Sequence, residues 1–263
     1  KEADAVSFTG SVLTGRKVAE AAAANFIPSF LELGGNDPAI VLKSADIEAT
    51  ADRIVFSATS SSGQACQSLE RVYVDEAIAG ELTAAIVSRA REVTINHPDL
   101  EEGFIGPFIF ADQPGKVIAQ LEDAVAKGAQ IETGGKLIDH GGVWMEATVV
   151  TGVDHTMDLM TEETFGPVIP IMSFRNIDDA IRLANDTHYG LSASVFAGST
   201  EEGAVVARSI NAGAVSVNDA SLTSRVHTVP HESFGLSGLG RSRFGDEALA
   251  RYLRTKAILE QTG

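Results

Sequence analysis

The chain of 263 residues is 44% hydrophobic and 6% aromatic, which is enough apolar material for one large domain or two smaller ones. Acidic residues outnumber basic ones by 36 to 20, and the net charge of −16 makes nucleic acid and anionic membranes poor partners. No apolar run reaches the roughly 18 residues that a membrane-spanning helix needs, and no signal peptide is visible, so we expect a cytoplasmic protein.

Strand and helix patterns alternate along nearly the whole chain. Short apolar runs predict strands, and apolar residues at helical spacing predict the segments between them. This alternation predicts an α/β fold with a mostly parallel sheet and helices on both faces. The predicted strands are 6–10, 38–42, 71–74, 168–174, 192–197 and 214–218, and the predicted helices are 10–25, 47–58, 78–93, 116–127, 177–184 and one from about 200.

Three residues mark the ends of these helices. Asp46 is a predicted N-cap, and Asp75 likewise precedes a helix, because a carboxylate can accept from the free N–H groups of the first turn. Gly128 is predicted to end the helix that begins near 116. The region 221–245, rich in glycine, serine, proline and histidine, predicts a long ordered loop at a site or a subunit contact.

The only cysteine, Cys66, follows the serine- and glycine-rich stretch 60–63 and precedes a predicted strand. A thiol at such a turn is held by a scaffold and can face a cleft. Glu32 lies 34 positions earlier (66 − 32). A soft nucleophile and a carboxylate that takes or relays a proton are the minimum set for covalent catalysis on a carbonyl. By itself, however, a lone cysteine is more often buried and inert, and a lone glutamate is more often solvated.

Two further motifs suit parts of a dinucleotide. Gly10 and Ser11 come directly after a predicted strand and open a helix, where free N–H groups and the helix dipole suit a phosphate. Such a turn is also often purely structural. Glu163 and Phe165 lie at a tight turn before a strand, where a carboxylate can accept from ribose hydroxyls. An ordinary acidic turn with a core phenylalanine is the alternative.

The histidines predict no metal site. His227 and His231 are four residues apart, but Pro230 between them argues against a shared helical face. The sequence also lacks the lysine-containing glycine-rich loop of nucleoside triphosphate sites and the G-x-S-x-G motif of serine hydrolases.

Taken together and in this order, the motifs resemble those of the aldehyde dehydrogenase superfamily. The resemblance runs from one end of the chain to the other. It rests on Phe8-Thr9-Gly10-Ser11, Glu32-Leu33-Gly34-Gly35, Gly63-Gln64-Ala65-Cys66 with Arg71, Glu163-Thr164-Phe165-Gly166-Pro167, Asn185 through Leu191, Gly213-Ala214-Val215-Ser216-Val217-Asn218 and Ser237-Gly238-Leu239-Gly240-Arg241.

The resemblance implies oxidation of an aldehyde to a carboxylic acid, with NAD or NADP as the hydride acceptor. Cys66 would attack the aldehyde to give a thiohemiacetal and then a thioester, and Glu32 would activate the water that hydrolyses the thioester. The backbone N–H of Cys66 would be one oxyanion donor.

The resemblance also implies a set of cofactor-binding residues. Ser11 would lie near the pyrophosphate, Glu163 would hold the nicotinamide ribose and Phe165 would position the ring. The whole implied set is Gly10, Ser11, Gly34, Gln113, Lys116, Glu163 and Phe165.

Members of the superfamily are nearly twice as long, so the chain is expected to be the C-terminal half of such a protein. Residues 1–34 would be a remnant of the cofactor-binding domain, 35–233 the catalytic domain, and 234–263 a segment that returns to the cofactor domain or forms an oligomer contact. The asparagine that gives the second oxyanion donor would lie outside the chain. The sequence of residues 230–235 departs from the one usual in the superfamily, so the resemblance does not predict the loop on the substrate side.

Three functions therefore compete. The first is an aldehyde dehydrogenase whose nucleophile and base lie in this chain, acting as a homodimer or homotetramer on an aldehyde that the sequence does not name. The second is a non-catalytic folded fragment with a role in oligomerisation. The third is a cofactor-independent thiol esterase. A thiol pKa well below the usual value of about 8.5 would argue against an inert cysteine.

Overall fold

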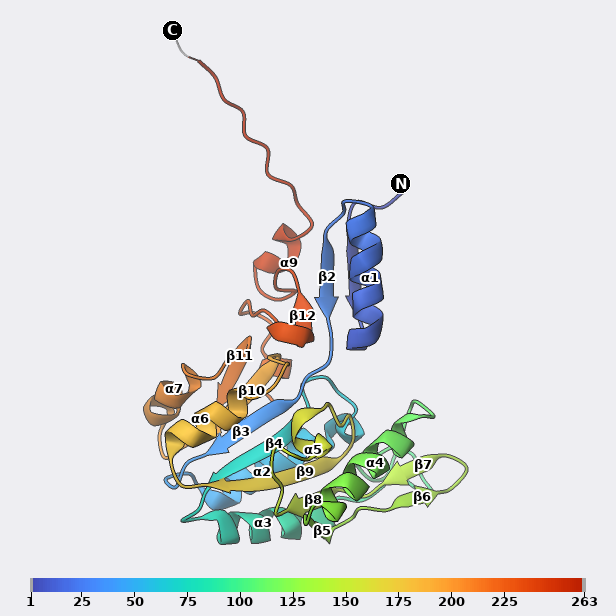
Figure 1. Cartoon of the computed structure of the whole chain (residues 1–263), viewed down its shortest axis with the longest axis vertical. Coiled ribbons are helices and arrows are strands. Elements are labelled where there is room, and N and C mark those ends of the chain that lie inside the picture. The colour runs from blue at the N-terminus through green and yellow to red at the C-terminus, as the bar shows by residue number, and fades with distance from the viewer. Residues whose placement is uncertain (1, 262–263) are drawn as a thin grey trace.

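The computed structural model describes residues 2–261. Figure 1 shows a larger body built around one sheet and a smaller part formed by α1, β2 and β12, from which the C-terminal stretch projects. Within the described residues, no helix is both long enough and apolar enough to cross a membrane.

The elements are as follows. The strands are β1 (Val6–Thr9), β2 (Ser29–Glu32), β3 (Asp37–Val41), β4 (Leu69–Asp75), β5 (Gln130–Thr133), β6 (Leu137–Asp139), β7 (Val143–Met145), β8 (Thr148–Thr151), β9 (Val168–Phe174), β10 (Ser192–Phe196), β11 (Ala214–Val217) and β12 (Gly238–Leu239). The helices are α1 (Val12–Ala24), α2 (Ile47–Thr59), α3 (Ala79–Glu92), α4 (Gln113–Ala126), α5 (Asp158–Thr161), α6 (Ile177–Asn185), α7 (Thr200–Ala207), α8 (Leu222–Arg225) and α9 (Glu247–Ala250), with 3-10 turns η1 (Ser60–Gly63) and η2 (Gly235–Ser237).

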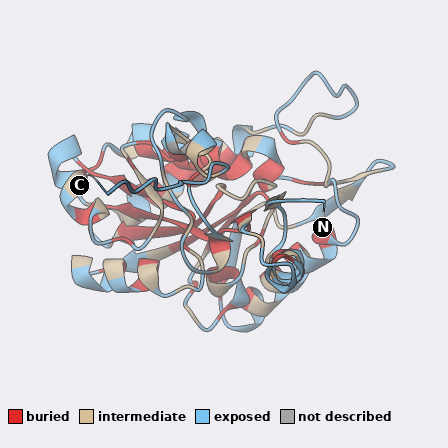
Figure 2. Ribbon diagram, turned by 90° about the horizontal axis from the view of Figure 1, so that it is seen from above, coloured by how far each residue is buried: buried red, intermediate tan, exposed pale blue. Residues whose placement is uncertain are grey.

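The main sheet has seven strands in the order β11-β10-β3-β4-β9-β8-β5. All neighbours are parallel except β5 and β8. Ala39 and Val41 of β3 pack in one core cluster and Ile40 in the other, as the alternation of a strand requires. Figure 2 shows the buried residues concentrated in this sheet and in the helix faces against it. The predicted α/β class, with a mostly parallel sheet covered on both faces, is confirmed.

The smaller part brings the two ends of the chain together. Strand β1 pairs in parallel with β2, and β12 pairs with β2 in antiparallel, so that Gly238 lies opposite Glu32. The N-cap of α1 is Ser11, whose hydroxyl accepts from the N–H of Thr14 at 3.3 Å. Glu32, the predicted base, therefore lies at the end of β2 and beside a strand of the C-terminal region.

Most predicted boundaries agree with the structure. Asp46 caps α2 by accepting from the N–H of Ala49 at 3.0 Å, and Gly128, with φ +106°, follows α4 as predicted. Helix α3 begins later than expected, at Ala79, because Asp75 accepts from the N–H of Ala77 and closes a turn first. The strands β2 and β5 to β8 were not predicted.

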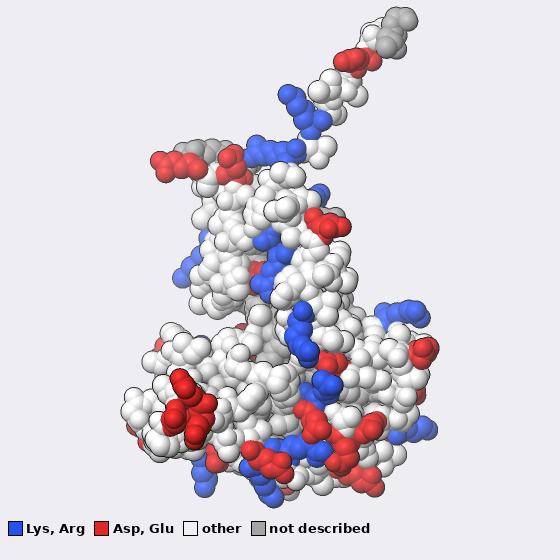
Figure 3. Space-filling model, turned by 180° about the vertical axis from the view of Figure 1, so that it is seen from behind, with Lys and Arg blue, Asp and Glu red and all other residues white. Residues whose placement is uncertain are grey.

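The region 221–245 is ordered and mostly irregular, as predicted, and it contains only the short elements α8, η2 and β12. On the face of the molecule shown in Figure 3, charged side chains of both signs crowd the larger body, with acidic ones prominent, in keeping with the net charge of −16.

Candidate active site

Cys66 lies just after a turn whose backbone is tightly specified. Ser61, Ser62 and Gly63 have φ values of +52°, +61° and +68°, a left-handed run that L side chains rarely adopt. A Cβ at Gly63 would lie 2.3 Å from the backbone carbonyl of Gly166, so only glycine fits there. The turn before Cys66 is therefore packed directly against the loop that carries Glu163.

Gln64 fixes the same turn from the other side. Its side chain donates to the carbonyl of Pro107 at 3.1 Å and accepts from the N–H of Ile109 at 2.8 Å. The hydroxyl of Ser62 accepts from the N–H of Gly106 at 2.8 Å. The glutamine in Gly63-Gln64-Ala65-Cys66 thus has a structural reason, which is to hold the cysteine in place.

The half-buried thiol of Cys66 lines a cavity of about 280 Å³. Its walls come from the end of α2, the turn η1, the cysteine segment and α8. The lining residues are Phe56, Ser57, Ser60, Ser61, Ala65, Cys66, Gln67, Ser68, Ser221, Ser224 and Arg225.

Glu32, the predicted base, is held by two residues of the C-terminal region. Its carboxylate accepts from the hydroxyl of Ser233 at 3.2 Å, and the guanidinium of Arg243 lies 3.9 Å away. The carboxylate side chain is 17% exposed. Neither partner was predicted as a site residue; the only signal was the unusual sequence of residues 230–235.

The motifs of Glu32 and Cys66 meet in space. Gly35, three residues after Glu32, approaches Cys66 so closely that a Cβ there would lie 2.3 Å from the carbonyl oxygen of the cysteine. The charges of Glu32, Asp37 and Glu163 all act on the thiol. Residues that are far apart in the chain therefore form one site.

The surroundings of Cys66 disfavour its thiolate. Burial raises the pKa of the Cys66 thiol, and the charge of Asp37 adds to this effect, whereas Arg243 opposes it. Asp37 is itself buried, accepts from the N–H and hydroxyl of Ser192, and has its pKa raised by burial to about 7. The thiol therefore depends on a cation or a base to ionise near neutral pH.

Glu163 lies against the glycines that follow Glu32. Its carboxylate accepts from the N–H of Gly35 at 3.0 Å, and a Cβ at Gly34 would lie 2.5 Å from it. Burial raises the pKa of Glu163, and Lys116 opposes the shift. Gly34, Lys116 and Glu163, three members of the cofactor-binding set that the resemblance implies, are thus neighbours.

A buried carboxylate that the sequence analysis missed holds the loop around Phe165. Glu70 accepts from the N–H of Thr164 at 3.0 Å and of Phe165 at 2.8 Å, and from the side chain of Asn36 at 3.3 Å. These bonds support Phe165 in a left-handed conformation with φ +51°. Burial, reinforced by the charge of Glu163, raises the pKa of Glu70 to about 8.

The remaining predicted residues lie in two places. Gln113 is buried and donates to the carbonyl of Thr164 at 2.7 Å, so it supports the same loop from behind. Gly10 and Ser11 lie at the start of α1, whose first turn has no acidic residue. A Cβ at Gly10 would lie 2.6 Å from the ring of Phe8.

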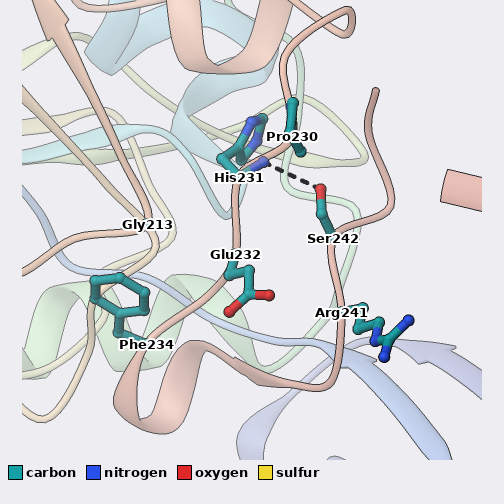
Figure 4. A pocket seen from close by; sticks show the side chains of 7 residues that line it. All are labelled: Gly213, Pro230, His231, Glu232, Phe234, Arg241 and Ser242. Atoms are coloured by element: carbon teal, nitrogen blue, oxygen red, sulfur yellow. Dashed lines mark hydrogen bonds between the residues drawn. The ribbon is translucent and has the colours of Figure 1, made fainter. Parts of the chain in front are cut away.

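A second and larger cavity, of about 490 Å³, lies beside the segment that holds Glu32 but does not include the thiol (Figure 4). His231 and Ser242 meet across it, with the N–H of His231 donating to the hydroxyl at 3.0 Å. The ring of His227 stacks on Phe244, and the ring of His231 packs against Phe244 at a tilt of 31°. Within the described part of the chain, no group of three or more potential metal ligands was found.

The fold and the site define an α/β protein that presents a cysteine thiol to a cavity with carboxylates close by. The sequence model of the aldehyde dehydrogenase family matches residues 1–258. The chain belongs to the aldehyde dehydrogenase family.

Individual relatives agree with this membership. A provisionally named aldehyde dehydrogenase of Anabaena variabilis has 50% identical residues and a TM-score of 0.96 over 99% of this chain and 56% of its own. Betaine aldehyde dehydrogenase of Staphylococcus aureus, solved with NAD+, has 33% identity and a TM-score of 0.90 over 97% of this chain and 51% of its own.

Two curated relatives have names with different substrates. A Mycobacterium tuberculosis protein provisionally named succinate-semialdehyde dehydrogenase (NADP+) 2 is 38% identical over 97% of this chain and 49% of its own length. The peroxisomal aminoaldehyde dehydrogenase 1 of Pisum sativum is 36% identical over 99% of this chain and 52% of its own length. The chain thus spans about half the length of the curated relatives it matches.

Proposed function

We propose that the whole protein oxidises an aldehyde to a carboxylic acid with NAD or NADP, and that this chain supplies the nucleophile and the base. The observation that carries the proposal is the meeting of the Cys66 turn with the segment after Glu32, which is in contact through Gly35. A thiol, a carboxylate and a cavity that opens at the thiol are what covalent catalysis on a carbonyl needs.

In this mechanism the sulfur of Cys66 attacks the carbonyl carbon, and the oxygen becomes an alkoxide. The backbone N–H of Cys66 stabilises that negative charge. Glu32 then removes a proton from the water that attacks the acyl carbon, and Cys66 leaves as the thiolate. Ser233 and Arg243 hold Glu32, so they set the position of the base.

The residues present fit a nicotinamide dinucleotide. The carboxylate of Glu163 lies over Gly34, where no side chain intervenes, and it would hold a ribose with Lys116 nearby. The start of α1 at Gly10 and Ser11 would receive the pyrophosphate. When bound, the cofactor would supply the hydride acceptor that turns the thiohemiacetal on Cys66 into a thioester. Phe165 and its support by Glu70 would fix the position of the ring, with Gln113 behind the loop.

The division of the chain remains part of the proposal. Residues 1–34 would belong to the cofactor domain, 35–233 to the catalytic domain, and 234–263 to a segment that returns to the first. A homodimer or homotetramer, a cytoplasmic location and the choice between NAD and NADP also stay predictions.

The test is NAD(P)H formation by the full-length protein with a panel of aliphatic and aromatic aldehydes. Cys66→Ala should abolish turnover, because it removes the thiol that attacks the carbonyl carbon, while thermal unfolding stays close to that of the wild type. Ser173→Ala, which removes an exposed hydroxyl of β9 outside the cavity at Cys66, is the control and should retain activity. Equal turnover by the wild type and the Cys66 variant would overturn the proposal, and so would a folded wild type that oxidises no aldehyde.

A further inference from the structure

The walls of the cavity at Cys66 differ in charge from the rest of the chain. Acidic residues outnumber basic ones by 36 to 20 overall, yet among the described residues none that lines this cavity is acidic. One basic residue, Arg225 of α8, does line it. An anionic group bound in this cavity would therefore lie near one cation and near no carboxylate of the described walls.

Arg225 is available for a ligand. It is exposed, and its guanidinium takes part in no hydrogen bond or ion pair within residues 2–261 as the structure describes them. By contrast, Arg53 on α2 is paired with Asp219 at 3.1 Å. The hydroxyls of Ser61 and Ser221, on the same walls, likewise donate to no acceptor within the described residues and could add to the recognition of an anion.

The carboxylates around the thiol determine which end of a substrate carries the negative charge. Glu32, Asp37 and Glu163 all act on Cys66 when they are ionised, so in that state they repel an anionic group placed next to the reacting carbonyl. A negative group is therefore favoured at the far end of the molecule, toward Arg225. The ring of Phe56 offers an apolar wall for the carbons between.

The size of the cavity limits the number of carbons between the aldehyde and the negative group of the substrate. Its volume of about 280 Å³ lies just below the range of roughly 300–1,000 Å³ typical of sites for drug-sized ligands. A short aliphatic aldehyde suits it better than a large one.

We propose that Arg225 binds the terminal carboxylate of a short aldehyde whose other end reacts with Cys66. This proposal rests on the proposed function and names its substrate class. The Mycobacterium tuberculosis relative is named for a semialdehyde that is anionic in water. The Pisum sativum relative is named for an aminoaldehyde, whose amine is cationic in water. The lining of this cavity selects the first kind and disfavours the second.

The experiment uses two pairs of probes with the full-length protein. The first pair is 3-maleimidopropionate and its neutral amide, with the alkylation rate of Cys66 as readout. The second pair is 4-oxobutanoate and its neutral amide, with kcat/KM as readout. Each pair is tested on Arg225→Gln, on Arg225→Lys, and on Arg208→Gln, which removes an exposed arginine outside the cavity.

Arg225→Gln should lower the anion-to-amide ratio about fivefold in both assays, whereas Arg225→Lys and Arg208→Gln should change it little. Ratios that do not respond to Arg225→Gln would overturn the anion site. A ratio that falls for the maleimides in a protein that oxidises no aldehyde would keep the anion site and reject the dehydrogenase function. The two ideas can therefore fail separately.

Discussion

At the scale of single residues, the reactivity of Cys66 is decided by opposing neighbours. Burial and the charge of Asp37 raise the pKa of the thiol, and Arg243 is the group that lowers it. Arg243 also lies 3.9 Å from Glu32 and stacks over Phe244 at 4.7 Å. One guanidinium thus lies close to Glu32 and also acts on the thiol of Cys66.

Arg243→Gln should move the pH profile of Cys66 alkylation by iodoacetamide to higher pH, because the cation that favours the thiolate is gone. Arg243→Lys should restore most of the profile. Arg241→Gln removes a neighbouring arginine that lines the larger cavity, and it serves as the matched control. A profile that stays in place, or moves to lower pH, in Arg243→Gln would contradict this electrostatic account.

At the scale of elements, the loop between α5 and β9 is held by a residue of β4. Glu70 lies at the second position of β4 and receives the N–H groups of Thr164 and Phe165. An N–H that lost this partner would be left buried and unsatisfied, which costs about 1–3 kcal/mol. Through these hydrogen bonds, β4 fixes the conformation of the loop that carries Glu163.

Glu70 should also make stability depend on pH. Its pKa is about 8 in the folded protein and about 4.3 in an unfolded chain. The folded state therefore keeps a proton that the unfolded state releases between these values. The free energy of unfolding should fall as pH rises from 5 to 8, by at most a few kcal/mol from this group.

Urea denaturation at a series of pH values checks this prediction. Glu70→Gln should flatten the fall, whatever its effect on stability at pH 5. Glu76→Gln, which removes an exposed carboxylate paired with Arg175 at 2.8 Å, should leave the slope unchanged. Equal slopes in the wild type and in Glu70→Gln would show that the buried carboxylate does not hold its proton in the folded state.

At the scale of the whole molecule, the sequence predicts the main sheet from β11 to β9 but not the two strands beyond β9, which are β8 and β5. The apolar run of β9 and the caps of α2 and α4 are local signals, and the structure agrees with them. Strands β5 to β8 were not predicted because they are short. Strands β5 and β6 are also largely exposed, so these two have no continuous apolar pattern. Strand β2 has only four residues and is identified by its pairing with β1 and β12.

The sequence also predicts only part of the candidate site. The motifs of Cys66, Glu32 and Glu163 could be found in the sequence, and the structure brings them together. The supporting residues could not be found, because Glu70, Ser233 and Arg243 act only through contacts with distant parts of the chain. The sequence predicts which groups react, and the fold is needed to identify the residues that hold them.

The central claim is that Cys66 is acylated and Glu32 is needed to release the acid. Intact-mass and peptide mapping of Glu32→Gln, treated with an aldehyde and NAD or NADP in the full-length protein, test it most directly. The account predicts an acyl group that accumulates on the peptide of Cys66, less of it in the wild type, and none in Cys66→Ala. An unmodified Cys66 in Glu32→Gln, or an acyl group on another residue, would contradict it.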